Sequence, residues 1–147
     1  MSDKKNFSDQ PDILFVMTDN NRADVFAALG NSHIYTPNFD RLIRRGVSFD
    51  CAYTPYPVCV PARYIIRTGC NTPTTRSIGN APPKPLPGQP QDMEERCGEY
   101  LARRMGKLGY RTFGIGKFHP VPEEEDIGYE TYMQVKDLYP TPQIRAQ

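Results

Sequence analysis

Residues 12–18, with the sequence DILFVMT, form the apolar run that most constrains how this 147-residue chain can fold. The run is too continuous for a half-exposed strand and is typical of a buried strand in a parallel sheet. It stops abruptly at the polar residues DNN. The sequence therefore predicts an α/β domain that begins with a buried strand.

Helical and strand-like segments alternate after this run. Residues 22–30, RADVFAALG, predict a short helix that ends at Gly30, and residues 36–46, TPNFDRLIRRG, predict a second helix with Thr36 as its N-cap. Further strands are predicted at 47–53 and 111–118, further helices at 59–69 and 92–110, and a proline-rich surface loop at 81–91. This order implies right-handed βαβ units in a three-layer α/β sandwich around a mostly parallel sheet.

Charge and hydropathy narrow the class of partner. The chain has 18 basic and 17 acidic residues and a net charge of +1, so no basic patch favours nucleic acid. No apolar run approaches the length of a membrane span, and no signal peptide is recognisable. We therefore expect a cytoplasmic protein that binds a small molecule, with no nucleic-acid or membrane partner.

The cysteines argue against a structural zinc site, because they form no CxxC pair and no paired histidine spacing accompanies them. Cys51, Cys70 and Cys97 are interpreted as small buried apolar residues or free thiols. Disulfides remain possible.

The stretch CVPARYIIRTG, residues 59–69, places Cys59 at the start of a predicted helix, Pro61 in its first turn and Arg63 one turn on, on the same face as the cysteine. A helix amino end favours negative charge, and a guanidinium group suits phosphate-like or sulfate-like oxygens. A cysteine phosphatase loop would need an arginine at position 65, which is Ile65. A buried cysteine at an ordinary helix start is the alternative.

Polar residues follow the predicted strands at both ends of the chain. Asp19 and Asn20 follow the first strand, and Lys117 and His119 follow the last. Because ligands gather beyond the carboxyl ends of parallel strands, these residues and Cys59 are candidates for one shared edge. Taken singly, Asp19 is equally typical of a turn or helix cap, and Lys117 and His119 of solvated loop residues.

Four segments of the chain, in order, resemble the type I sulfatases and the related phosphonate monoester hydrolases of the alkaline phosphatase-like superfamily. CVPAR followed by YIIRTG is similar to their Cys-x-Pro-Ser/Ala-Arg-x4-Thr-Gly signature. PDILFVMTDNNRADV, TPNFDRLIRRGVSFDCAYTPYPVC and GYRTFGIGKFH match in the same order. The likeness runs from about Pro11 to His119 and implies an alkaline phosphatase-like fold that is incomplete in this chain.

The resemblance assigns chemistry to particular residues. It implies that a formylglycine-generating enzyme oxidises Cys59 to formylglycine, and that Asp19, Asn20 and the modified Cys59 bind Ca²⁺, or Mg²⁺ or Mn²⁺ in its place. Lys117 would hold the sulfate oxygens, and His119 would take the proton whose loss expels sulfate. Asn20 departs from the commoner aspartate of sulfatases and is closer to the phosphonate hydrolases.

Three further positions bear on the resemblance. Arg63 matches the arginine of the signature and is the remaining candidate catalytic residue. Cys70 stands where the family usually has an arginine, a change that leaves the chemistry intact. His33 also has a counterpart in the family, and we interpret it as structural.

The expected organisation is a disordered terminus at residues 1–10, the amino-terminal part of a sulfatase catalytic domain at 11–119, and an acidic, proline-containing tail or truncated continuation at 120–147. Family members are several times longer, and the segment that supplies their other metal ligands has no match here. The expected function is hydrolysis of a small sulfate ester once the rest of the sulfatase chain completes the site. The alternatives are hydrolysis of phosphonate or phosphate esters, and a noncatalytic remnant that binds anions.

Overall fold

The computed structural model describes residues 10–134 of the chain. Contacts divide the chain into two compact units, Met1–Tyr53 and Thr54–Gln147, and each unit is described by itself. The predicted disordered terminus lies almost wholly outside the described residues, as do the last 13 residues of the predicted tail, 135–147.

The first unit is organised around helix α1, Pro37–Arg45, which has Thr36 as its N-cap residue as predicted. The Thr36 hydroxyl does not cap α1 itself. It donates to Asp40 Oδ1 at 2.8 Å and accepts from the Ala27 amide at 2.9 Å. Asp40 Oδ1 also accepts from the Ala28 amide at 3.0 Å, so this buried carboxylate fastens the preceding turn to α1.

The predicted helix at 22–30 is two short 3-10 turns, η2 (Ala23–Val25) and η3 (Ala27–Leu29). Phe26 separates them with an extended backbone, φ −96° and ψ 126°. Its ring packs against Phe39 of α1 with centroids 5.1 Å apart, a tertiary contact that helical periodicity does not reveal. Gly30 ends the second turn with a φ of 106°, as its sequence position predicts.

Two predicted strands are not formed in the first unit. Residues 12–18 are in no strand and their apolar side chains are exposed, Leu14 by 88%. Residues 47–53 are likewise in no strand, and Val47 and Phe49 are exposed. A strand needs a neighbour for its backbone hydrogen bonds, and neither segment finds one among residues 10–134. Apolar content alone was therefore an insufficient basis for the buried-strand prediction.

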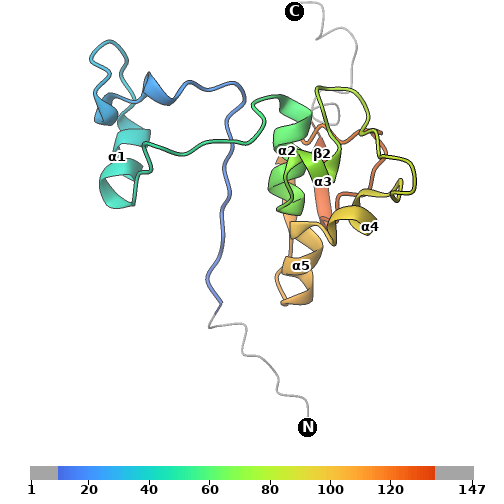
Figure 1. Cartoon of the computed structure of the whole chain (residues 1–147). Coiled ribbons are helices and arrows are strands. Elements are labelled where there is room, and N and C mark those ends of the chain that lie inside the picture. Colours follow the sequence, from blue (N-terminus) through green and yellow to red (C-terminus); the bar gives the residue numbers. More distant parts are fainter. Residues whose placement is uncertain (1–9, 135–147) are drawn as a thin grey trace, which may run out of the picture. The chain divides into compact units, whose positions relative to one another are not determined.

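The second unit packs helices against a small parallel sheet (Figure 1). Its helices are α2 (Cys59–Thr68), α3 (Thr72–Thr75), α4 (Met93–Cys97) and α5 (Leu101–Lys107), and its strands are β1 (Phe113–Gly116) and β2 (Thr131–Gln134). The strands are in register, with Phe113 opposite Thr131 and Gly116 opposite Gln134. The prediction of a parallel sheet with helices is confirmed for these two strands.

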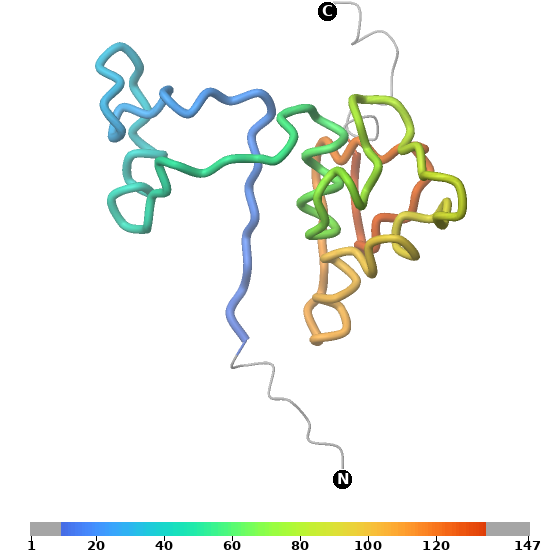
Figure 2. The backbone as a smooth tube through the Cα atoms, in the orientation of Figure 1, coloured from blue at the N-terminus to red at the C-terminus, as the bar shows by residue number. Residues whose placement is uncertain are grey.

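Helix α2 begins and ends where the sequence predicts. Cys59 is its first residue, and Gly69 follows its last turn with a φ of 72°, which a glycine adopts without steric cost. The proline-rich segment 81–91 contains no helix or strand, as predicted, and forms a long loop between α3 and α4 (Figure 2).

The single helix predicted over 92–110 is two helices, α4 and α5. The chain breaks at Gly98, whose φ of 79° and ψ of 172° are not helical. The Tyr100 amide instead donates to Glu94 Oε1 at 2.7 Å, and the tyrosine side chain enters the core. The apolar spacing continues through the break, so periodicity alone did not reveal it.

The core of this unit is formed by Val60, Tyr64, Met93, Tyr100 and Ile127, with Phe118, Tyr129 and Tyr132 packed around it.

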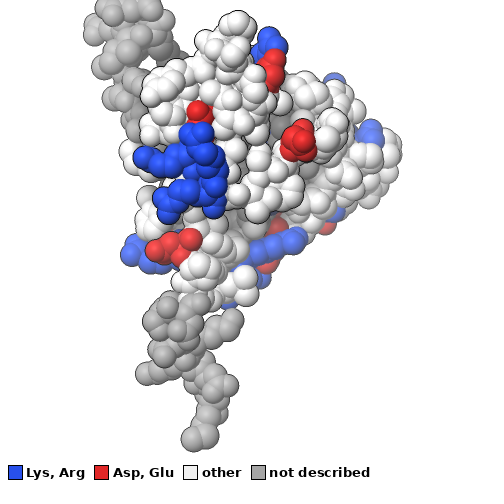
Figure 3. Space-filling view, turned by 90° about the vertical axis from the view of Figure 1, so that its left-hand side faces the viewer, with Lys and Arg blue, Asp and Glu red and all other residues white. Residues whose placement is uncertain are grey.

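No helix within residues 10–134 is long and apolar enough to cross a membrane. Helix α1 of the first unit has exposed arginines at positions 41, 44 and 45. Basic side chains gather on part of the face in Figure 3, and acidic side chains lie beside them and elsewhere on it.

Gly114 of β1 tests how tightly this unit is packed. A Cβ atom at this position would overlap Cζ of Phe118. That ring packs edge-on against Tyr129 and Tyr132, with centroids 5.2 and 5.6 Å away. We expect Gly114→Ala to lower the free energy of unfolding by about 1–3 kcal/mol, measured by chemical denaturation.

Gly106 of α5 is the matched control, because a Cβ atom there meets nothing within 4 Å. Gly106→Ala should stabilise the unit by about 0.5–1 kcal/mol through helix propensity. Equal stability of the Gly114→Ala variant and the parent chain would show that the Phe118 ring is free to move aside.

Candidate functional site

The candidate site begins at the amino end of α2. Cys59 is half-buried in the first helical position, and Pro61 follows in the first turn, where its missing N–H costs little. The side chain of the N-cap residue, Val58, cannot cap the helix, and Asn80 partly replaces it: its Oδ1 accepts from the Val60 amide at 3.2 Å. A side chain 20 residues away thus fixes the start of the helix next to the cysteine.

The second part of the site is the segment that follows β1. Lys117 is exposed, and its Nζ lies 3.8 Å from Cys59 Sγ. His119 is half-buried and has a φ of 54°, in the left-handed region that non-glycine residues seldom adopt. The backbone therefore leaves the extended conformation at His119.

Two arginines of α2 fasten this segment to the helix. Arg63 Nη1 donates to the Lys117 carbonyl oxygen, and Arg67 Nη1 donates to the Phe118 carbonyl oxygen at 3.1 Å. Both guanidinium groups are buried, and their residues lie one turn apart on one helix face. Of the predicted catalytic residues, Lys117 contacts both Cys59 and Arg63, and His119 lies two residues beyond Lys117.

Beyond His119, the half-buried carboxylate of Glu125 holds the chain against the helices. Glu125 Oε2 is 2.5 Å from the Tyr64 hydroxyl, and Glu125 Oε1 accepts from the Tyr100 hydroxyl. The Tyr64 hydroxyl is also within hydrogen-bonding distance of the Val121 carbonyl, at 2.9 Å. Burial, followed by the nearby Glu125 charge, raises the pKa of both tyrosines, so their hydroxyls stay protonated at neutral pH.

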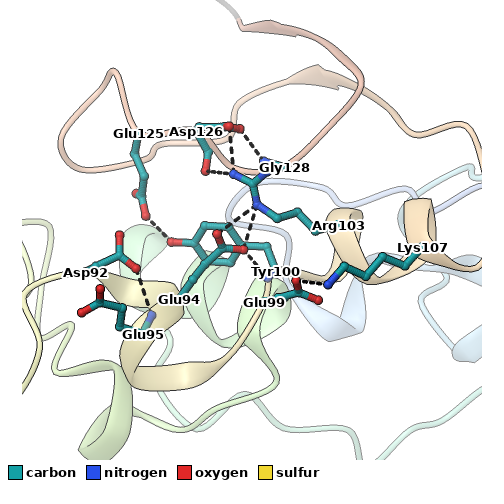
Figure 4. Close-up of polar contacts among 10 residues, drawn as sticks. All are labelled: Asp92, Glu94, Glu95, Glu99, Tyr100, Arg103, Lys107, Glu125, Asp126 and Gly128. Atoms are coloured by element: carbon teal, nitrogen blue, oxygen red, sulfur yellow. Dashed lines mark hydrogen bonds and ion pairs between the residues drawn. The ribbon is translucent and has the colours of Figure 1, made fainter.

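An ion-pair network continues from this cluster, as Figure 4 shows. Arg103 of α5 donates to Glu94 at 2.9 Å and pairs with Asp126 at 2.8 Å. The Asp126 carboxylate also accepts from the Gly128 amide at 2.9 Å, and this bond and Arg103 lower the pKa of Asp126. The loop between His119 and β2 is thereby tied to α4 and α5.

The cysteines outside the signature are free thiols, as expected. Cys51 is exposed, and Cys70 and Cys97 are half-buried. Cys70 Sγ lies 3.6 Å from the Cys97 carbonyl oxygen. Burial, together with Cys70, raises the pKa of Cys97 to about 11, so this thiol is protonated at neutral pH.

Asp19 and Asn20 belong to the first unit, and Asn20 has a φ of 52°. No group of three or more His, Cys, Asp or Glu side chains converges within residues 10–134 in a way that could hold a metal ion. The predicted ligand set has only two such side chains, Asp19 and Cys59, so this absence does not test it. The role of Asp19 and Asn20 as ligands stays a prediction.

Sequence reasoning missed three residues that shape this site: Arg67, Asn80 and Glu125. Each acts through a contact with a residue at least 20 positions away. Arg67 carried the one usable signal, because a charged side chain there interrupts the apolar face of α2.

Comparison with known proteins identifies the family of this chain. The sequence model of the sulfatase family matches residues 11–145, and the chain belongs to this family. Membership implies an alkaline phosphatase-like α/β fold, of which the described sheet and helices form a small part.

The relatives are bacterial sulfatases. The chain is 32% identical over 124 residues to an arylsulfatase of Clostridium perfringens, and the match covers 84% of this chain and 24% of that arylsulfatase. It is 33% identical over 139 residues to a sulfatase of Formosa agariphila, and the match covers 93% of this chain and 27% of that sulfatase. An N-acetylglucosamine-6-O-sulfatase of Bacteroides thetaiotaomicron is 29% identical over 126 residues, and the match covers 86% of this chain and 21% of that sulfatase. The chain thus spans about a quarter of the length of these proteins.

Proposed function

We propose that the chain is the nucleophile-bearing part of a sulfate ester hydrolase in which Cys59 is converted to formylglycine. The observation that carries the proposal is the placement of Cys59 at the amino end of α2, 3.8 Å from the Lys117 ammonium group. The helix end and the ammonium group both favour an anionic ligand at this position. Family membership supports sulfate as that anion.

The modified residue supplies a chemistry that serine and cysteine lack. When hydrated, formylglycine offers two hydroxyls on one carbon, so one can attack the sulfur while loss of the other's proton later breaks the carbon–oxygen bond to the bound sulfate. Water therefore need not attack a second unreactive ester. The thiol of Cys59 marks where these hydroxyls stand.

The surrounding residues take roles that follow from their positions. Lys117 would neutralise the sulfate oxygens, because its ammonium group lies 3.8 Å from Cys59 Sγ. Arg63 would hold the backbone of Lys117 through its carbonyl. His119 would accept the proton whose loss releases sulfate, as an imidazole can at neutral pH.

Asp19 and Asn20 are proposed to contribute to a metal site that residues outside this chain complete. A carboxylate and an amide oxygen suit a hard cation such as Ca²⁺, Mg²⁺ or Mn²⁺. The comparison supports this reading, because relatives are about four times as long as the matched segment. The remaining polypeptide of the hydrolase and the formylglycine-generating enzyme are the proposed protein partners, and the compartment is proposed to be the cytoplasm.

The test is expression of the chain together with a formylglycine-generating enzyme, followed by mass spectrometry of the peptide that contains Cys59. We expect the thiol sulfur to be replaced by an aldehyde oxygen in the parent chain and in a Cys51→Ala control. The completed protein should then hydrolyse an aryl sulfate, and Cys59→Ala should abolish turnover. A thiol that stays unmodified throughout would refute the proposal and favour a noncatalytic chain. Hydrolysis that survives Cys59→Ala would refute it as well, because another residue would then supply the nucleophile.

Asn20 favours a second candidate, hydrolysis of phosphonate or phosphate esters. An amide in place of a carboxylate removes one negative charge from the proposed metal site, which favours a more anionic substrate such as a phosphate monoester. Turnover of an aryl phosphonate and an aryl sulfate by the same preparation distinguishes the two. A higher kcat/KM for the phosphonate would overturn the sulfate assignment.

A further inference from the structure

Arg67 is the least expected side chain of α2. Its residue is only 6% exposed, and its guanidinium group lies 4.4 Å from the ring centre of Tyr64 and 5.8 Å from that of Tyr100. Its one hydrogen bond in the described part of the chain joins Nη1 to the Phe118 carbonyl oxygen. Nε and Nη2 are buried and have no hydrogen-bond partner among residues 10–134.

Stability does not account for an arginine at this position. A buried charge costs free energy unless it is fully paired, and replacing one by an apolar side chain is often neutral or stabilising. Two aromatic faces and one carbonyl offset that cost only in part. The nearby carboxylate, Glu125, is already bonded by the hydroxyls of Tyr64 and Tyr100, so removing Arg67 would not leave it without donors.

The Phe118 carbonyl that Arg67 holds is next to a point of strain. In an extended strand, successive carbonyl groups point to opposite sides. Here the carbonyls of Lys117 and Phe118 are both bonded by α2, through Arg63 and Arg67. The next residue, His119, has a φ of 54°. The second bond therefore fixes the backbone between the two predicted catalytic residues.

We infer that Arg67 is a positioning residue: its bond to the Phe118 carbonyl holds Lys117 beside Cys59 and maintains the turn at His119. The inference rests on the proposed function, because it says that Arg67 arranges the side chains proposed to bind sulfate. What it predicts directly is that Arg67 determines where the Lys117 ammonium group lies. That location is measurable without any turnover.

The unmodified Cys59 thiol serves as the reporter. Its thiolate attacks a methanethiosulfonate reagent at the sulfenyl sulfur, forming a mixed disulfide and releasing methanesulfinate. The rate is measured with an anionic reagent, sulfonatoethyl methanethiosulfonate, and a cationic one, trimethylammonioethyl methanethiosulfonate. Peptide mass spectrometry reads Cys59 separately from Cys51, the exposed internal reference. Because one thiolate attacks both reagents, the thiolate fraction cancels in the ratio of rates.

The parent chain should favour the anionic reagent at Cys59 by about fivefold at low salt, because the Lys117 ammonium group is in contact range. We expect Arg67→Met to reduce this preference by about threefold or more without lowering the free energy of unfolding. Arg67→Lys, which keeps a cation but not the guanidinium geometry, should fall between them. Arg104→Met, at an exposed arginine of α5, should leave the ratio unchanged.

Lys117→Met gives the ratio of rates expected when the ammonium group is absent. Adding Arg67→Met to Lys117→Met should not change that ratio further. An unchanged ratio in Arg67→Met would overturn the inference. Loss of folding in Arg67→Met would overturn it as well, because Arg67 would then be a stability residue. Neither outcome depends on formylglycine or on hydrolysis, so failure of the inference is distinguishable from failure of the proposed function.

Discussion

Lys117→Met is expected to lower kcat/KM for an aryl sulfate by about a hundredfold or more in the completed, formylglycine-bearing protein. The Lys117 ammonium group lies 3.8 Å from Cys59 Sγ, and so stands next to the oxygens of a sulfate group transferred to that residue. Methionine keeps most of the side-chain length and removes the charge. Steady-state kinetics with an aryl sulfate provide the measurement.

Lys107→Met is the matched control, since Lys107 is an exposed lysine of α5 whose ammonium group pairs with Glu99. A surface ion pair of this kind contributes little, so kcat/KM should stay within about twofold of the parent value. If Lys117→Met also stayed within that range, the ammonium group would have no part in sulfate binding. The placement of Cys59 and Lys117 would then be coincidental.

The sequence predicted the bounds of helix α2 well because local chemistry determines them. Pro61 in the first turn and Gly69 after the last turn define α2, and the structure places Cys59 at its first residue. The proximity of Lys117 followed from the rule that functional residues gather beyond strand ends. These predictions needed only backbone preferences and chain order.

The predictions that failed depended on partners. The apolar run at 12–18 has the composition of a buried strand, but burial requires neighbours that the described residues do not supply. Gly98 was compatible with helical spacing, and only the inward turn of Tyr100 reveals the break. The bond from Arg67 to Phe118 spans 51 positions, a distance over which a single sequence carries no contact signal.

The second large effect is expected at Glu125, which joins the loop after His119 to α2 and α5. Tyr64 and Tyr100 are each 1% exposed, and both hydroxyls bond this carboxylate. Glu125→Ala leaves the Tyr100 hydroxyl buried without its acceptor. We expect the free energy of unfolding to fall by about 2–4 kcal/mol, measured by denaturant titration.

Glu124→Ala is the control, because Glu124 is the exposed neighbouring glutamate and its loss should change stability by about 0.5 kcal/mol or less. Combining Tyr100→Phe with Glu125→Ala should cost less than the sum of the two single changes, since a buried hydroxyl and its acceptor then leave together. Additive losses would mean that the two groups do not interact in solution.

The same cluster gives a pH signature with a definite sign. Burial and Glu125 raise the pKa of Tyr64 and Tyr100 above the ordinary value of about 10, so the folded chain retains protons that the unfolded chain loses. Stability from this source is complete below about pH 10 and declines above it, by about 1.4 kcal/mol per pH unit for each tyrosine. Tyr64→Phe and Tyr100→Phe should each reduce that slope. A free energy of unfolding that stays level from pH 9 to 11 in the parent chain would place both hydroxyls in water and remove the anchor that holds the loop after His119.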